Sequence, residues 1–297
     1  MGTQFEIDIE RFKITDGTTF SLSDYPTEIK KKGIEKEEGE LIIQKDIEEL
    51  SSLQDVLFAE NRHAVLIVIQ AMDAAGKDGT IKHIMSGVNP AGVQVSSFKS
   101  PSGMELDHDY FWRHYVALPG KGEIGIFNRS HYENVLITKV HPELILNEKH
   151  CKIRTLKDID KTFWEDRYKQ IIRFEKNLTE NDTTILKFFL HVSKDVQKER
   201  FLERIDDPSK NWKFSSTDLK ERAFWDNYQQ AYDNAISATS TKLAPWFIIP
   251  ADNKWYMRLI VGKIICYELK KLDLAYPVIS DSEKAALNKA KMILLNE

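Results

Sequence analysis

The chain has 297 residues, with 42 lysines and arginines against 46 aspartates and glutamates, a formal net charge of −4. At 42% hydrophobic and 30% charged residues, the composition is that of a globular protein and excludes disordered and fibrous classes. The mildly acidic total argues against a nucleic-acid binder. No apolar run approaches the length of a membrane span, and the N-terminal residues do not read as a signal peptide. We expect a cytoplasmic protein with no membrane partner.

The charge is unevenly distributed along the chain. Residues 1–60 hold 7 basic and 15 acidic residues, whereas the remaining 237 hold 35 and 31. We predict an acidic N-terminal arm and helix over 1–60, a main domain over 61–272 and a C-terminal tail over 273–297. The simplest interpretation of the arm is a solvated leader packed on the surface, and a subunit interface is the alternative. Cys151 and Cys266 lie far apart, which predicts buried, reduced thiols rather than a disulfide.

The first half of the chain alternates between helical and strand-like apolar patterns. Helical spacing from Leu41 to Phe58 precedes a β-branched run at 64–69, which is typical of a strand buried on both faces. A helix is predicted after Gly76-Lys77. We then expect a strand at 93–98, a helix at 107–118, a strand at 123–127 and a helix from about Ser130.

The second half continues the alternation. We predict a long helix over 155–178, a strand over 184–192 with Ser193 as the N-cap of the next helix, and a loop at 206–216. Another helix to about Ala238, a strand at 246–249 and a helix at 253–272 complete the pattern. Alternating strands and helices predict an α/β fold, with a parallel five-stranded sheet flanked by helices.

The most informative segment is residues 70–80, which follows the first buried strand and opens a helix. Amide N–H groups at a helix start attract anions, and Lys77 would place its ammonium on a phosphoryl group. The match to G-x-x-x-x-G-K-[ST] is incomplete, because Ala71 and Asp78 replace its first and last residues. The alternative is an ordinary strand-to-helix turn. The remaining residues of the predicted phosphate loop are Ala74, Ala75, Gly76, Asp78, Gly79 and Thr80.

An aspartate inside such a loop, Asp73, is unfavourable beside phosphates unless it holds a metal or accepts a proton. A second polar group follows the strand at 123–127. Asn128 would offer a neutral oxygen to a metal, Arg129 could clamp a phosphoryl group, and Glu133 lies one turn further on. The alternative for this second group is a helix N-terminus with ordinary salt bridges.

Four motifs together resemble the polyphosphate kinase 2 family, over roughly residues 40–272. They are residues 72–80, 97–101, 111–113 and 127–133. The resemblance implies a P-loop kinase fold similar to thymidylate kinase with a helical lid, and a homodimer or homotetramer. It also implies Mg²⁺-dependent phosphoryl transfer between inorganic polyphosphate and nucleoside mono- or diphosphates. Asp73 and Lys77 match the family's loop, and Asn128 resembles the branches that accept AMP. The metal ligands it suggests are Asp73, Asn128 and Glu133.

Basic residues in the second half suit a lid that closes over a phosphate chain, at about residues 194–222. They are Arg200 and Arg204, which are spaced i,i+4, and then Lys210 and Lys213. A salt-bridged, solvated helix is the alternative, since acids are interspersed. Trp212 could stack on a base or anchor the lid. Lys99 and Arg113 are candidates for the phosphate of the acceptor nucleotide, together with Asn128 and Glu133.

The resulting hypothesis is a polyphosphate:nucleotide phosphotransferase that converts ADP to ATP and AMP to ADP, with guanine nucleotides as further possible substrates. Lys77, Arg129 and Asp73 are its catalytic residues: the two cations neutralise developing charge, and Asp73 binds Mg²⁺ or positions the acceptor oxygen. The alternatives are an ATP-dependent nucleoside monophosphate kinase, for which a Ser or Thr is expected where Asp78 stands, and a non-catalytic nucleotide-binding regulator.

Overall fold

The computed structural model describes residues 7–29 and 34–297, which form an α/β fold around one six-stranded sheet. The strand order is β1-β6-β5-β2-β4-β3. Five neighbouring strands are parallel, as the alternating pattern predicts, and β1 is antiparallel to β6. The strands are β1 (Lys13–Ile14), β2 (Ala64–Ala71), β3 (Val93–Ser97), β4 (Ile124–Asn128), β5 (Thr183–His191) and β6 (Trp246–Pro250).

The prediction of five strands is wrong by one, and the extra strand comes from the N-terminal arm. Lys13 pairs with Phe247 and Ile14 with Trp246. A two-residue strand is too short to show an alternating pattern. Phe12 and Leu22 of the arm are buried in the main core. The described part of the arm is therefore an edge of the domain and not a solvated leader.

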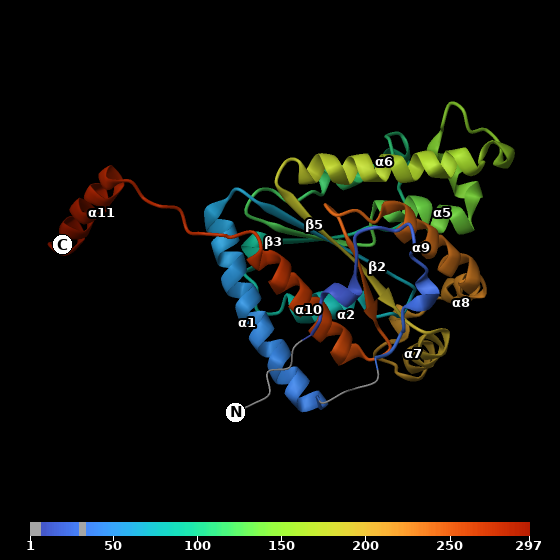
Figure 1. Ribbon diagram of the computed structural model, residues 1–297, viewed down its shortest axis with the longest axis horizontal. Coiled ribbons are helices and arrows are strands. Elements are labelled where there is room, and N and C mark those ends of the chain that lie inside the picture. The colour runs from blue at the N-terminus through green and yellow to red at the C-terminus, as the bar shows by residue number, and fades with distance from the viewer. Residues whose placement is uncertain (1–6, 30–33) are drawn as a thin grey trace.

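Helices cover both faces of the sheet (Figure 1). On one face, α1 (Lys36–Glu60) and α10 (Lys254–Lys270) lie side by side, next to α2 (Lys77–Ile84). The other face carries α5 (Ile137–Val140), α6 (Lys161–Thr179) and α9 (Trp225–Thr239). The helices α7 (Lys194–Asp206) and α8 (Ser216–Ala223) lie near the carboxyl ends of the parallel strands. The tail forms α11 (Asp281–Leu294), which projects from the body with all of its residues exposed.

Three predicted helices differ from the structure. The segment 107–118 contains only α4 (Trp112–Val116), which follows the short α3 (Gly103–Leu106). Between them the Asp109 carboxylate accepts a hydrogen bond from the amide of Phe111 at 2.8 Å, a local turn that competes with helix. The helix expected from Ser130 is a 3₁₀ turn (His131–Val135), and the one expected from Thr155 begins only at Lys161, after the N-cap Asp160.

The single helix expected to end near Ala238 is divided at Phe224 into α8 and α9. The remaining helix and strand expectations are confirmed within a few residues. Ser193 caps α7, accepting a hydrogen bond from the amide of Val196 at 3.2 Å. The strand β2 is buried along its whole length, as its β-branched run predicts. Cys151 and Cys266 are both free, as predicted. Cys266 is buried, but Cys151 is exposed because it lies in the irregular segment before α6, so the predicted burial of Cys151 is wrong. Within 7–29 and 34–297, none of the helices is both long enough and apolar enough to cross a membrane.

Candidate active site

The predicted phosphate loop lies between β2 and α2, as the sequence indicates. Two of its residues have positive φ angles: Ala74 at 60° and Gly76 at 112°. Positive φ is unfavourable for a residue with a side chain, and strain of this kind is typical of ligand-binding loops. The first helical hydrogen bond of α2 runs from the Thr80 amide to the Gly76 carbonyl at 3.0 Å. The amides before it are free of the helix and line the loop.

Lys77 extends into the loop from the first position of α2. Its ammonium donates to the carbonyl oxygens of Ala71 at 2.9 Å and Met72 at 3.4 Å. Burial lowers the pKa of Lys77, and nearby Asp73 opposes this shift. The predicted loop residue Thr80 turns away: it is buried, and its hydroxyl donates to the Gly76 carbonyl at 3.0 Å.

The second polar group stands beside the loop because β4 pairs with β2. Asn128 is opposite Ile69 in the parallel register, and the carboxyl ends of neighbouring parallel strands meet at one edge of the sheet. The Asn128 amide nitrogen donates to the Asp78 carboxylate at 2.7 Å. Arg129 has a φ of 61°, the third positive value in this area.

Arg129 links the two groups. Its guanidinium lies 3.1 Å from the Asp73 carboxylate in the loop. The neighbouring charge of Glu133 raises the pKa of Arg129, while burial raises the pKa of Glu133. The Gln70 amide, oriented to satisfy both of its ends, donates to Glu133 at 2.9 Å and accepts from the Ser130 hydroxyl at 3.0 Å. The basic Arg129 thus interacts with two acidic residues, Asp73 and Glu133.

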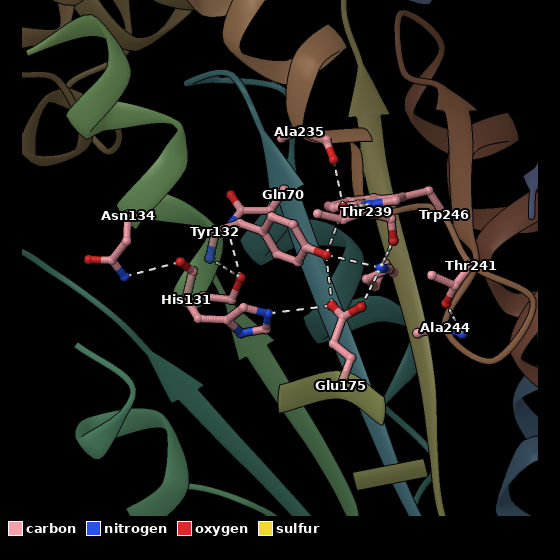
Figure 2. A network of polar contacts seen from close by, with 12 residues as sticks. Gln70, His131, Tyr132, Asn134, Glu175, Ala235, Thr239, Thr241, Ala244 and Trp246 are labelled. Atoms are coloured by element: carbon pink, nitrogen blue, oxygen red, sulfur yellow. Dashed lines mark hydrogen bonds and ion pairs between the residues drawn. The ribbon is translucent and has the colours of Figure 1, made fainter. Parts of the chain in front are cut away.

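A buried polar network supports the turn that carries Arg129 and Glu133 (Figure 2). The Tyr132 hydroxyl donates to the Glu175 carboxylate at 2.7 Å. It accepts from the Lys187 ammonium at 2.9 Å, and the same ammonium lies 2.7 Å from Glu175. Trp246 donates its indole N–H to the Thr239 hydroxyl at 3.0 Å. The network ties the turn after β4 to β5, β6, α6 and α9.

A pocket of about 200 Å³ opens beside Arg129. It contains three of the four predicted nucleotide-binding residues, Lys99, Arg113 and Glu133, together with Arg129. The Arg113 guanidinium donates to the Lys99 carbonyl at 2.7 Å and lies over the Phe98 ring. The fourth residue, Asn128, is not among those that line this pocket. The structure therefore separates Asn128, at the loop, from the other three.

The four predicted lid bases do not form one surface. Arg200 is 5% exposed, and its guanidinium binds backbone carbonyls of the loop, so it does not face outward as its spacing from Arg204 suggests. Arg204 donates to the Lys213 carbonyl at 3.2 Å. Lys210 and Lys213 are exposed, Lys210 paired with Asp207 at 2.8 Å. Trp212 is 79% exposed, with the Lys213 ammonium over its ring.

The sequence reasoning missed three side chains at the site. Gln197 is buried and donates to the Asp73 carbonyl at 2.9 Å. Asp218 of α8 has a pKa raised first by burial and then by the charge of Asp73. Gln70 precedes the loop and orients Glu133. No spacing rule marks these residues, because each contact depends on how separate helices and strands pack.

The comparisons with known proteins identify the family. The family model "Polyphosphate kinase 2 (PPK2)" matches residues 33–276. The chain belongs to the polyphosphate kinase 2 family. It is 45% identical over 290 residues to a Rhodopseudomonas palustris protein named "ADP-polyphosphate phosphotransferase", covering 98% of this chain and 99% of that one.

Two further relatives support the assignment. A Meiothermus ruber protein named "AMP/ADP-polyphosphate phosphotransferase" is 48% identical over 228 residues, covering 77% of this chain and 80% of that one. The crystal structure of polyphosphate kinase 2 from Arthrobacter aurescens TC1 superposes with a TM-score of 0.83 at 38% identity, covering 94% of this chain and 96% of that one. The family's P-loop kinase fold therefore extends over almost the whole chain.

Proposed function

We propose that the protein transfers phosphoryl groups between inorganic polyphosphate and nucleoside phosphates, converting ADP to ATP and AMP to ADP. The printed names of the R. palustris and M. ruber relatives support the substrates. The observation that carries the proposal is that Arg129 takes part in two regions of the site. It lines the pocket that holds Lys99 and Arg113, and it also contacts Asp73 in the phosphate loop at 3.1 Å. Two anion-binding regions share this one guanidinium.

We assign the donor to the loop and the acceptor to the pocket. Amides at the start of α2 and the Lys77 ammonium bind the terminal phosphates of the polymer. Lys99 and Arg113 hold the phosphate of the nucleotide, whose terminal oxygen is the nucleophile. Since phosphoryl transfer has a loose transition state, Lys77 and Arg129 act by neutralising charge and by aligning the two substrates. Arg204, Lys210 and Lys213 contact the polymer further along.

The site fits Mg²⁺ in the way that kinases usually hold it. Within the described ranges, no group of three or more His, Cys, Asp or Glu residues is arranged to bind a metal without help. Mg²⁺ in kinases keeps several waters and uses one or two carboxylates plus substrate phosphates. Asp73, half-buried at the loop, is the carboxylate that we assign to it, with Asn128 and Glu133 as further candidate ligands. A bound Mg²⁺ would neutralise phosphate charge during transfer.

The test is an end-point assay with the purified protein, Mg²⁺ and polyphosphate. ADP should give ATP and AMP should give ADP, and parallel reactions with GMP and GDP determine whether guanine is accepted. Replacing polyphosphate by ATP as the donor to AMP separates the proposal from an ordinary nucleoside monophosphate kinase. If no ATP forms from ADP and polyphosphate, the proposal is wrong. Sedimentation of the same sample tests the expected homodimer or homotetramer.

A further inference from the structure

The helix α7 contacts the back of the phosphate loop through two buried side chains. Gln197 donates to the Asp73 carbonyl at 2.9 Å. One guanidinium nitrogen of Arg200 donates to the carbonyls of Ala74 at 3.1 Å and Ala75 at 2.9 Å. Three consecutive loop carbonyls therefore accept hydrogen bonds from a single helix.

These bonds determine where the loop amides point. In a planar trans peptide the carbonyl and the following N–H point in opposite directions. Holding the carbonyls of residues 73, 74 and 75 toward α7 directs the amides of residues 74, 75 and 76 away from it, and two of these amides toward the anion site. The Ala75 amide closes a turn onto the Met72 carbonyl at 3.3 Å. This leaves the amides of Ala74 and Gly76 to join those at the start of α2.

The other end of Arg200 holds a second segment. Its remaining terminal nitrogen donates to the carbonyls of Ala251 at 2.7 Å and Asp252 at 2.9 Å, directly after β6. The planar fork thus makes four hydrogen bonds to two stretches of backbone, one more than the three protons of a lysine ammonium allow. Burying a cation among carbonyl groups is costly. An apolar side chain would pack α7 at lower cost, so packing alone does not account for an arginine here.

A further contact connects this arrangement to α8. The Arg222 guanidinium donates to the Gln197 side-chain oxygen at 2.7 Å and to the Lys194 carbonyl at 2.8 Å. The Gln197 amide is therefore held at both ends, by Arg222 on one side and by the Asp73 carbonyl on the other. The Gln197 side chain cannot rotate away from the Asp73 carbonyl without also breaking its bond to Arg222.

We propose that Arg200 and Gln197 are positioning residues that orient the peptide groups of the phosphate loop and so preform its anion site. This inference rests on the proposed function for the identity of the anion, a phosphate chain. It replaces the hypothesis that Arg200 is a polyphosphate ligand of a mobile lid. The N-terminal part of α7 belongs to the loop's support, and direct contact with the polymer is confined to residues beyond it.

The test measures binding rather than turnover, with tripolyphosphate as the probe and calorimetry as the readout. Arg200→Lys keeps the charge but loses the fork, so we expect its dissociation constant for tripolyphosphate to rise about 10-fold. The constant for ADP, whose pocket does not include α7, should change less than about 2-fold. Gln197→Met should raise the tripolyphosphate constant by about 3-fold. Lys198→Ala removes an exposed cation from the same helix and should leave both constants within about 2-fold.

Two outcomes would overturn the proposal: unchanged tripolyphosphate binding in Arg200→Lys, or equal weakening of tripolyphosphate and ADP, which indicates general loosening. If Arg200→Lys does not fold, Gln197→Met decides by the same comparison of ligands. A wild-type protein that binds tripolyphosphate but makes no ATP would contradict the proposed function and leave the positioning role standing. A wild-type protein that makes ATP, with variants that bind normally, would contradict the positioning role alone.

Discussion

Lys187 on the sheet and Lys77 at the start of α2 both have ammonium groups shielded from water, but their contacts differ. The Lys187 ammonium, on β5, donates to the Tyr132 hydroxyl, the Glu175 carboxylate and the Thr239 carbonyl, at 2.9, 2.7 and 2.9 Å. The Lys77 ammonium, after β2, donates to two backbone carbonyls. Burial lowers the pKa of both. All three protons of Lys187 have partners, whereas Lys77 has a proton left for a ligand.

From this difference we expect the charge of Lys187 to stabilise the fold and the charge of Lys77 to serve the proposed chemistry. A buried ion pair is stabilising only when each group keeps its partner, and Lys187 has its partner within the protein. Lys77 lies near Asp73, Glu133 and Asp78 without a carboxylate bound to its ammonium. An arriving phosphate would supply that negative charge. We therefore expect mutation of Lys187 to cost stability and mutation of Lys77 to cost activity.

The largest expected effect is the loss of stability when Lys187 is replaced. Lys187→Met leaves the Glu175 carboxylate buried without the cation that is bonded to it, which should lower the free energy of unfolding by about 3–5 kcal/mol. Adding Glu175→Gln removes the stranded charge and should restore much of the loss. Urea denaturation measures both. Lys77→Met strands no bonded carboxylate and should cost less, about 1–2 kcal/mol for its two carbonyl hydrogen bonds. An equal loss in the two single variants would remove the distinction.

The second largest expected effect is the loss of turnover when Lys77 is replaced. Lys77→Ala should reduce kcat by about 10²–10³-fold, the usual loss for one charge-stabilising donor. Lys82→Ala, an exposed lysine on the same helix, is the matched control and should retain near-normal kcat. Steady-state assays with ADP and polyphosphate decide the matter. Near-normal activity of Lys77→Ala would exclude Lys77 from the mechanism.

Which parts of the fold and of the site can be predicted from the sequence depends on how far apart along the chain the interacting residues lie. The phosphate loop follows from local order: a buried β-branched run, then Gly76-Lys77, then a helix. The position of Arg129 beside the loop follows from parallel pairing of β2 and β4. Both segments lie where the sequence predicts them, and their roles stay predictions.

Contacts between distant elements could not be predicted in this way. Lys187 and Glu175 lie on separate elements, and a lysine in a strand pattern gives no sign that a carboxylate meets it. The i,i+4 spacing of Arg200 and Arg204 indicates a shared helix face, but not that Arg200 is buried against the loop. The sequence does not predict β1, because a two-residue strand is too short to show an alternating apolar pattern.

The Tyr132 hydroxyl gives a smaller effect that sharpens the comparison within the network. Tyr132→Phe removes a donor to Glu175 and an acceptor of Lys187, and should lower the free energy of unfolding by about 1–2 kcal/mol. Tyr228→Phe is the matched control. Its hydroxyl donates to Glu221 at a part-buried site and should cost less than about 1 kcal/mol. Equal losses in urea denaturation would argue against a special contribution from the network.

Acidification tests the network by proton linkage. Burial raises the pKa of Glu175, but Lys187 and His131 outweigh it, so the folded pKa lies below the unfolded value. The unfolded chain therefore binds the proton first, and the contribution of Glu175 is lost as pH falls from about 4.5 through the folded pKa, at up to about 1.4 kcal/mol per pH unit. The double variant Lys187→Met/Glu175→Gln should lose less stability over this range. An unchanged acid slope in urea denaturation at several pH values would contradict the assignment.

The smallest expected effect is that of salt concentration on the two KM values. It distinguishes buried from exposed cations at the site. Lys213 is exposed, while Arg113 has a side chain only 12% exposed. Since salt screens exposed charges far more than buried ones, raising ionic strength from about 0.05 to about 0.3 M should increase the KM for polyphosphate a few-fold and the KM for ADP less.

Two exposed lysines between α7 and α8 refine this prediction. Lys210 is paired with Asp207, whereas the Lys213 ammonium lies over the Trp212 ring, which leaves its charge uncompensated. Lys213→Ala should therefore reduce the salt dependence of the polyphosphate KM more than Lys210→Ala does. Equal salt dependence of the two KM values in the wild-type protein would mean that the polymer is held mainly by the buried groups of the loop, and the exposed lysines would then have no part in binding it.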